Sequence, residues 1–197
     1  MIDPSTTFRD LLTTDLAGWR TAGHGGFRWV APGILESHGG PGLLWYADEI
    51  FDDFTLHVTW PTTTATDNSG VFLRSPALDD TPAPAIAHGY EVQIDDRGFD
   101  PQTGSYDSPL HITGAIYRLA PGAKGLSHPT GDWNEFVIMA RGPWIRVVLN
   151  GSPAAQLDAG TRNRTGHLAL QCHHEGAAVQ FKRVAISRLM HDPALPP

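Results

Sequence analysis

Glycine and proline residues divide this sequence into short segments from one end to the other. The 21 glycines and 16 prolines are spread along the chain, and they separate short runs rich in β-branched and aromatic residues. Runs of this kind, bounded by turn residues, are typical of β-strands. We predict strands at residues 27–30, 43–46, 54–60, 70–74, 90–94, 115–119, 134–140, 144–149, 167–172 and 179–188. Ten or more short strands without a long 3.6-residue period predict an antiparallel sandwich or barrel.

The segments between these strands carry their own signals. Asn150-Gly151 is a strong two-residue hairpin signal, so the chain should return into a strand over 153–157. Residues 79–88 are rich in proline, which lacks the N–H of a strand ladder, and residues 96–111 show no periodicity. Both are predicted as irregular segments, and long loops in compact domains are often functional. The only hint of a helix is short, over residues 8–12.

Length and charge limit the organisation and the partners. A chain of 197 residues is long enough for one substantial core, so we predict a single domain over residues 1–190 and a frayed tail over 191–197. The net charge of −7 without a basic cluster argues against nucleic acid as a partner. The sequence shows neither a signal-peptide pattern nor an apolar run long enough to span a membrane, which predicts a soluble, cytoplasmic protein without a membrane partner.

The most informative stretch is Gly-Tyr-Glu-Val-Gln-Ile-Asp-Asp at residues 89–96. In a strand, successive side chains point to opposite faces, so Val92 and Ile94 share one face and Glu91, Gln93 and Asp95 share the other. Two carboxylates and an amide are costly on a face that is buried and unpaired. They are expected on a face that binds a polyhydroxylated ligand.

Other predicted strands repeat this division into an apolar and a polar face. Arg74 lies on the face opposite Val71 and Leu73, and Tyr117 belongs to a similar run. Gln171 and His173 alternate with the apolar residues of 168–172, where the single cysteine, Cys172, is expected to be buried and inert. A face rich in arginine, tyrosine, glutamine and histidine favours sugar recognition, although a polar face that is merely solvated is the simpler alternative.

The residues alone do not decide whether this polar row is catalytic. Glycoside hydrolysis usually requires two carboxyl groups about 5–9.5 Å apart. Glu91 and Asp95 have Cα atoms roughly 13 Å apart on a flat strand, although Asp96 and Asp107 are also available nearby. His173 is a further candidate for a general base near neutral pH.

The spacing of potential ligands does not indicate a metal site or a cofactor. His173 and His174 are adjacent and point to opposite faces of a strand, and neither an H-E-x-x-H motif nor a cysteine cluster is present. We therefore predict no metal site and no cofactor. A divalent cation such as Ca²⁺, bound by carboxylates and carbonyl groups of residues 95–107, is the alternative.

A set of motifs resembles the 3-keto-disaccharide hydrolase family, long known as domain of unknown function 1080. The similarity runs through most of the chain in order, and its motifs lie at residues 67–74 (DNSGVFLR), 89–96 (GYEVQIDD), 113–117 (TGAIY), 131–134 (GDWN), 149–151 (LNG), 166–173 (GHLALQCH) and 179–186 (VQFKRVAI). The order and spacing of these motifs together carry the resemblance.

The resemblance implies an all-β, concanavalin-A-like jelly roll of two antiparallel sheets with a ligand groove on one of them. Glucanases of this fold carry their catalytic acids in an E-x-D-x-E row, in which Gln93 here replaces the middle acid. The resemblance also implies action on glycosides oxidised at C3, whose ketone acidifies the C2 proton and permits elimination by one base. Glu91 or His173 would then be the base, assisted by Asp95.

The remaining roles follow from the same resemblance. Arg74 and Tyr117 would polarise the ketone, whereas Gln93 and Gln171 would hold the hydroxyl groups of a small sugar or glycoside. The first alternative is a non-catalytic carbohydrate-binding module of the same fold, and the second is a structural or interaction domain. The sequence does not indicate an oligomeric state.

Overall fold

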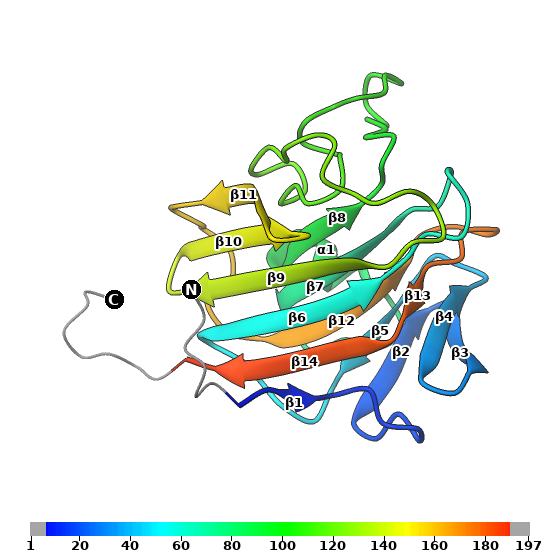
Figure 1. The fold of residues 1–197 in the computed structure, drawn as a ribbon. Coiled ribbons are helices and arrows are strands. Elements are labelled where there is room, and N and C mark those ends of the chain that lie inside the picture. Colours follow the sequence, from blue (N-terminus) through cyan, green and yellow to red (C-terminus); the bar gives the residue numbers. More distant parts are fainter. Residues whose placement is uncertain (1–6, 190–197) are drawn as a thin grey trace.

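The computed structural model describes residues 7–189 as a sandwich of antiparallel sheets (Figure 1). The first sheet has the order β1 (Arg9–Asp10), β14 (Arg183–Arg188), β6 (Phe54–Trp60), β9 (Asn134–Arg141), β10 (Trp144–Leu149) and β11 (Ser152–Leu157). The second has the order β2 (Trp19–Gly23), β5 (Gly42–Tyr46), β12 (His167–Cys172), β7 (Ser69–Ser75) and β8 (Tyr90–Ile94). A third, small sheet contains β13 (Gln180–Phe181), β4 (Ile34–His38) and β3 (Gly26–Ala31).

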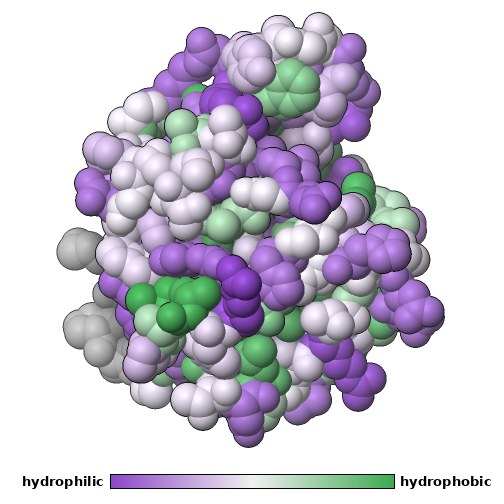
Figure 2. All heavy atoms as spheres, turned by 90° about the vertical axis from the view of Figure 1, so that its right-hand side faces the viewer, coloured by the Kyte–Doolittle hydropathy of each residue, from purple (hydrophilic) through white to green (hydrophobic). Residues whose placement is uncertain are grey.

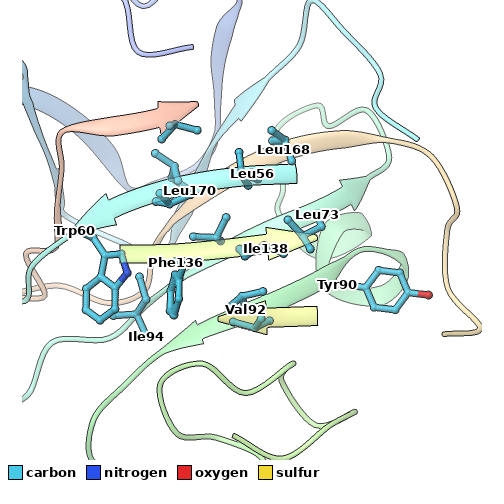
Figure 3. Packing of buried hydrophobic residues seen from close by; sticks show 14 of the residues in the cluster. Leu56, Trp60, Leu73, Tyr90, Val92, Ile94, Phe136, Ile138, Leu168 and Leu170 are labelled. Carbon is cyan, nitrogen blue, oxygen red and sulfur yellow. The ribbon is translucent and has the colours of Figure 1, made fainter. Parts of the chain in front are cut away.

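The hydrophobic core fills the space between the two large sheets. Each strand contributes alternate residues, so Leu56, Phe136 and Ile138 of the first sheet face Val92 and Leu170 of the second (Figure 3). All five side chains are at most 1% exposed. Removing this apolar surface from water is the main stabilising term of such a fold. The face of the molecule seen in Figure 2 is correspondingly hydrophilic for the most part, with its hydrophobic side chains in small, separate groups.

The predicted all-β sandwich is confirmed, and so is its clearest hairpin. Asn150 and Gly151 both have positive φ angles, 50° and 78°, between β10 and β11. Two successive residues with positive φ are typical of the two-residue turns that join twisted strands. The chain returns over Ser152–Leu157, close to the predicted range.

Three local predictions were wrong, and one lies outside the described residues. The proline-rich segment 79–88 contains the short helix α1 (Ala83–His88), because prolines are tolerated in the first turn of a helix. Residues 115–119 form turns with isolated bridges instead of a strand, and residues 8–12 contain strand β1 instead of a helix. The tail predicted over residues 191–197 lies outside the described part.

Helix α1 covers part of the outer face of the five-stranded sheet. A second hydrophobic cluster joins the two, with members Ala22, Leu43, Trp45, Phe72, Leu78, Ala85 and Ala169. Trp45 is only 4% exposed in this cluster, so it does not provide an open stacking surface for a sugar. The rest of the outer face carries the polar residues of β7, β8 and β12. Within residues 7–189, no helix has the length and apolar character needed to cross a membrane.

Candidate functional site

The register of β12, β7 and β8 arranges the outer face in rows across the sheet. Glu91 pairs with Phe72, and Phe72 pairs with Ala169. In the next row Gln93 pairs with Gly70, and the pairing of Leu170 with Val71 places Gln171 beside Gly70 on the other side. Gly70, which has no side chain, therefore lies between two glutamines.

Glu91 is a buried carboxyl group on this face. The residue is 8% exposed, and its side chain leans over Gly70. Desolvation raises the pKa of Glu91 to about 8, against the opposing effects of the Gln171 amide and the Arg162 guanidinium. A carboxyl group that titrates near the pH of the cell is well suited to proton transfer.

Glu91 opens into a cavity of about 370 Å³ at the edge of the sheet. The lining residues come from five separate parts of the chain, namely β7 (Phe72), α1 (Ile86), β8 (Glu91), a turn (Tyr117, Arg118 and Leu119) and the loop before β12 (Arg162). The main-chain N–H of Tyr117 donates to the carbonyl of Glu91 over 2.8 Å, which fixes the turn at 116–120 beside β8. Burial, together with the charge of Glu91, raises the pKa of the Tyr117 phenol, so that it remains a hydrogen-bond donor.

Arg162 forms another wall of this cavity. Its Nη1 atom donates to the carbonyl groups of Gly89 at 2.6 Å and Ile86 at 3.2 Å, and its main-chain N–H donates to the Tyr90 hydroxyl at 2.8 Å. These bonds attach the loop before β12 to the end of α1 and to β8. The guanidinium group is therefore held near Glu91 by main-chain atoms.

Gln93 and Gln171 lie where the sequence predicts them, on the same face as Glu91. The Oε1 atom of each is buried and has no hydrogen-bond partner within the described residues. Buried polar atoms in native structures nearly always have a partner, which is protein or water. Two unsatisfied acceptors therefore flank Gly70, and a ligand hydroxyl group that reached them would supply the missing partner.

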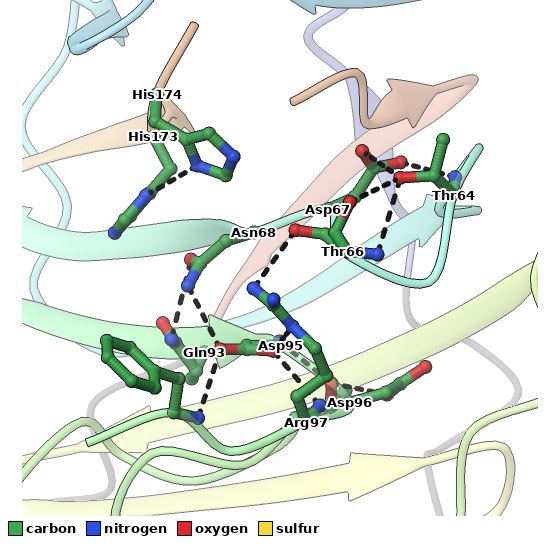
Figure 4. A network of polar contacts seen from close by, with 12 residues as sticks. Thr64, Thr66, Asp67, Asn68, Gln93, Asp95, Asp96, Arg97, His173 and His174 are labelled. Carbon is green, nitrogen blue, oxygen red and sulfur yellow. Dashed lines mark hydrogen bonds and ion pairs between the residues drawn. The ribbon is translucent and has the colours of Figure 1, made fainter. Parts of the chain in front are cut away.

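Asp95 is on the predicted face, but its carboxylate is already fully engaged (Figure 4). It is 0% exposed and accepts hydrogen bonds from the Asn68 amide at 3.2 Å and from the main-chain N–H groups of Arg97 at 3.0 Å and Phe99 at 3.2 Å. The Arg97 guanidinium lies 3.5 Å away. These contacts anchor the start of the long loop that follows β8, so they give Asp95 a structural task.

His173 lies on the same face but far from Glu91. Continuing the register places it in the row of Asn68 and Asp95, about 13 Å along the strands and two strand spacings of about 4.8 Å across from Glu91. Its Nδ1 atom lies 3.0 Å from that of His174 (Figure 4). His173 is exposed as a residue, but partial desolvation of its ring, with the nearby His174 and Arg97, lowers the pKa of His173 to about 4. The structure does not bring this predicted base to the Glu91 cavity.

Arg74 is also separated from the site, because the strand bulges at this position. Its φ angle is 54°, and the pairing of β7 with β12 shifts register beside it. The alternation of side chains is therefore broken. The buried guanidinium donates to the carbonyl groups of Asp52 at 2.7 Å and Gly142 at 2.6 Å, and it pairs with Asp53 at 3.2 Å. Its contacts are those of a structural arginine.

Several cavity residues were not predicted from the sequence. Arg118 follows Tyr117 directly and has a positive φ angle of 60°, whereas Arg162 is more than 70 residues from Glu91 in the chain. Ile86 lies on α1, within the segment 79–88 that was predicted to be irregular. Tyr117, the last residue of the family motif at 113–117, was a usable signal for its neighbour Arg118, but the loop at 162 gave none.

No group of three or more histidine, cysteine, aspartate or glutamate side chains within residues 7–189 is arranged to hold a metal ion. The acids of the loop after β8 are engaged in other contacts. Asp100 accepts the main-chain N–H of Gln102 at 2.8 Å, and Asp107 pairs with Lys124 at 3.1 Å.

Known structures share this architecture at low sequence identity. A "putative glycosyl hydrolase" from Parabacteroides distasonis superposes with a TM-score of 0.74 at 20% identity, covering 92% of this chain and 100% of that one. The carbohydrate-binding module CBM66 from Bacillus subtilis gives 0.63 at 13% identity, with coverages of 86% and 95%. A protein of unknown function with a galectin-like fold from Bacillus subtilis gives 0.59 at 11% identity, with coverages of 92% and 94%.

The family assignment comes from the sequence as a whole. No curated protein matches the chain. The profile of the 3-keto-alpha-glucoside-1,2-lyase-like domain, however, matches residues 7–187, which include every strand of both large sheets except the last residue of β14. This match confirms the resemblance found in the motifs, and the chain belongs to the 3-keto-alpha-glucoside-1,2-lyase-like family.

Proposed function

We propose that this protein cleaves the glycosidic bond of 3-keto-glycosides by elimination followed by hydration, with Glu91 as the group that transfers the proton. The observation that carries the proposal is the isolation of Glu91. It is the only carboxyl group among the residues that line the cavity of about 370 Å³, and burial raises its pKa to about 8. Elimination next to a ketone requires one carboxylate that acts as a base and donor groups that stabilise the ketone oxygen.

The position of Asp95 argues against displacement by two carboxylates. Three residues separate it from Glu91, so the two Cα atoms are about 13 Å apart, whereas retaining and inverting glycosidases hold their carboxyl groups about 5–9.5 Å apart. Both oxygens of Asp95 also accept hydrogen bonds from the protein. We assign Asp95 to holding the loop and not to the chemistry.

The chemistry follows from the acidity of the C2 proton beside a C3 ketone. In its ionised form Glu91 removes this proton, the electron pair of the C2–H bond forms the C1=C2 double bond, and the bond from C1 to the leaving oxygen breaks. The proton held by Glu91 is then available to the leaving oxygen. Water adds across the double bond and gives the free 3-keto sugar. A raised pKa strengthens Glu91 as the base in the first step.

Donor groups around the cavity suit the negative charge that develops on the ketone oxygen. Tyr117, Arg118 and Arg162 line the same space as Glu91, and their side chains can donate hydrogen bonds. Fixed donors aimed at a developing oxyanion are usually a large component of catalysis. We assign to these two arginines the role that the family resemblance implied for Arg74, and we keep Gln93 and Gln171 as the groups that bind hydroxyl groups.

His173 is a weaker candidate for the base. A histidine with a pKa near 4 is neutral at pH 7 but has little affinity for a proton, and its ring lies on a distant row of the sheet. We propose that His173, together with Asn68, lines the extension of the binding face beyond Gln93 (Figure 4).

The proposal is tested by incubating the protein with a panel of glucosides and their 3-keto forms, with and without a chelator, and measuring release of the aglycone. We expect cleavage of the 3-keto forms only, with a 2-hydroxy-3-keto-glycal detectable as the intermediate, and no effect of the chelator. Cleavage of unoxidised glucosides at equal or higher rates would contradict the elimination mechanism.

A second candidate function is binding of sugars without cleavage. The buried, unsatisfied Oε1 atoms of Gln93 and Gln171 favour it, because they are suited to hydroxyl groups and have no part in proton transfer. The same panel separates the two functions. A pure binding module would bind the glycosides in a calorimetric titration and would release no aglycone.

A further inference from the structure

Exposed hydrophobic side chains gather at the cavity that contains Glu91. Five large hydrophobic residues within the described part of the chain are exposed, namely Val30, Ile50, Ile86, Tyr106 and Leu119. Two of them, Ile86 at 52% and Leu119 at 37%, line this one cavity. Single exposed hydrophobic residues are ordinary, but a pair at the mouth of a polar pocket is informative.

These two side chains are carried by hydrogen-bonded parts of the backbone on different sides of the cavity. Ile86 lies on α1, where its carbonyl accepts the Arg162 guanidinium at 3.2 Å. Leu119 lies in a tight turn, in which its N–H donates to the carbonyl of Ile116 at 2.8 Å. Phe72, which is 1% exposed, also lines the cavity and pairs with Glu91 on the neighbouring strand. The three residues give the cavity a hydrophobic surface that ends at the carboxyl group.

The polar and apolar parts of the site are therefore spatially divided. Gln93 and Gln171 lie one row along the sheet from Glu91 and Phe72, and neither is among the residues that line the cavity. Ile86 and Leu119 have no hydrogen-bonding atoms in their side chains. A sugar ring over the glutamines would have its hydroxyl groups satisfied. The side chains of Ile86 and Leu119 offer a second sugar no hydrogen-bond partner, and the donors of the same cavity, Tyr117, Arg118 and Arg162, are assigned to the ketone.

We propose that the group leaving from C1 is an apolar aglycone, aromatic or alkyl, that packs between Ile86 and Leu119, rather than a second sugar. The inference rests on the proposed function, because it places the leaving group next to Glu91. It names the substrate class as glycosides of hydrophobic alcohols and phenols. Apolar pockets with a few polar groups that fix orientation are the usual form of such small-molecule sites.

Binding measurements test this specificity separately from catalysis. The probes are phenyl and methyl 3-keto-glucosides in both anomeric forms and a 3-keto disaccharide, titrated calorimetrically against the Glu91→Gln protein to prevent turnover. We expect the phenyl compound to bind at least about tenfold more tightly than the methyl compound or the disaccharide. Adding Ile86→Ser or Leu119→Ser should weaken phenyl binding about tenfold and leave methyl binding unchanged.

Ile50→Ser is the matched control, because Ile50 is 55% exposed and is not among the residues lining the cavity. It should leave all affinities unchanged. Equal affinity for the phenyl and methyl compounds, or a preference for the disaccharide, would overturn the inference. If the wild-type protein cleaves none of the probes but the phenyl preference and its loss in Ile86→Ser persist, the proposed catalytic function fails while the apolar subsite stands.

Discussion

The carboxyl group of Glu91 occupies the space that a side chain on Gly70 would require. A Cβ atom on Gly70 would lie 2.8 Å from the Cγ atom of Glu91, closer than such atoms approach in proteins. The pairing of β7 with β8 fixes this relationship, because Gly70 is opposite Gln93 and diagonal to Glu91. The absence of a side chain at Gly70 therefore allows the acid to lie flat on the sheet between the two glutamines.

Gly70→Ala should displace the Glu91 carboxyl group and lower kcat on a 3-keto-glucoside about 10²-fold, because small misplacements of a reacting group are costly. The backbone of Gly70 does not have a positive φ, so alanine is tolerated there and the cost in unfolding free energy should be about 1–3 kcal/mol. Gly26→Ala is the control, since its Cβ would meet only the ring of His38, at 3.2 Å, in another sheet. Equal kcat values for the two variants would show that Gly70 does not position Glu91.

Asp95→Asn tests the structural role of the second acid in the row. An amide cannot replace every acceptor that Asp95 offers to Asn68, Arg97 and Phe99, so the unfolding free energy should fall by about 1–3 kcal/mol in urea denaturation. The decrease in kcat should be much smaller than that of Glu91→Gln. Asp107→Asn serves as the control, because its carboxylate is 75% exposed in a surface ion pair. A loss of kcat in Asp95→Asn as large as that in Glu91→Gln would show that Asp95 takes part in catalysis.

Arg74→Met should destabilise the fold without impairing the site. The substitution leaves the carbonyl groups of Asp52 and Gly142 without their donors, which should lower the unfolding free energy by about 2–4 kcal/mol. At temperatures where the variant is folded, kcat and KM should remain those of the wild type. Arg28→Met removes an exposed ion pair with Glu36 instead, and should cost less than about 1 kcal/mol. A raised KM in Arg74→Met would mean that Arg74 reaches the ligand after all.

The difference between Arg74 and Glu91 shows how far strand alternation can be used on the sequence alone. Alternation correctly placed Glu91, Gln93 and Asp95 on one face, because β8 is regular and pairs continuously with β7. It failed at Arg74, because a positive φ angle and a register shift turn that side chain towards Asp52. A bulge depends on the neighbouring strand, so local sequence does not reveal it.

The residues that form the walls of the cavity could not be predicted from local sequence either, because tertiary contacts place them there. Arg162 reaches the site because its guanidinium group binds main-chain carbonyls of residues 86 and 89, a contact between distant parts of the chain. Ile86 reaches it because two prolines begin α1 instead of preventing a helix. Family motifs indicated the polar face, whereas the hydrophobic rim required the tertiary structure.

Burial of Glu91 should make stability depend on pH. The carboxyl group loses its proton near its ordinary value of 4.5 in the unfolded chain but near 8 in the folded protein. The unfolding free energy should therefore fall as pH rises from about 4.5 to about 8, by up to ~1.4 kcal/mol per pH unit, and level off above that range. Urea denaturation of Glu91→Gln across pH 5–9 should lack this component, whereas Glu175→Gln should retain it. A parallel pH dependence in wild type and Glu91→Gln would contradict the burial of an ionisable Glu91.

The most direct measurement of the central claim is single-turnover release of phenol from phenyl 3-keto-glucoside by wild type and by Glu91→Gln. Glutamine keeps the size of the side chain but cannot accept the C2 proton, so the rate should fall by about 10²–10⁴-fold while the affinity for the substrate remains within a few-fold. The wild-type rate should increase with pH and reach half of its maximum near the Glu91 pKa of about 8. A Glu91→Gln protein that releases phenol at the wild-type rate would show that Glu91 does not transfer the proton.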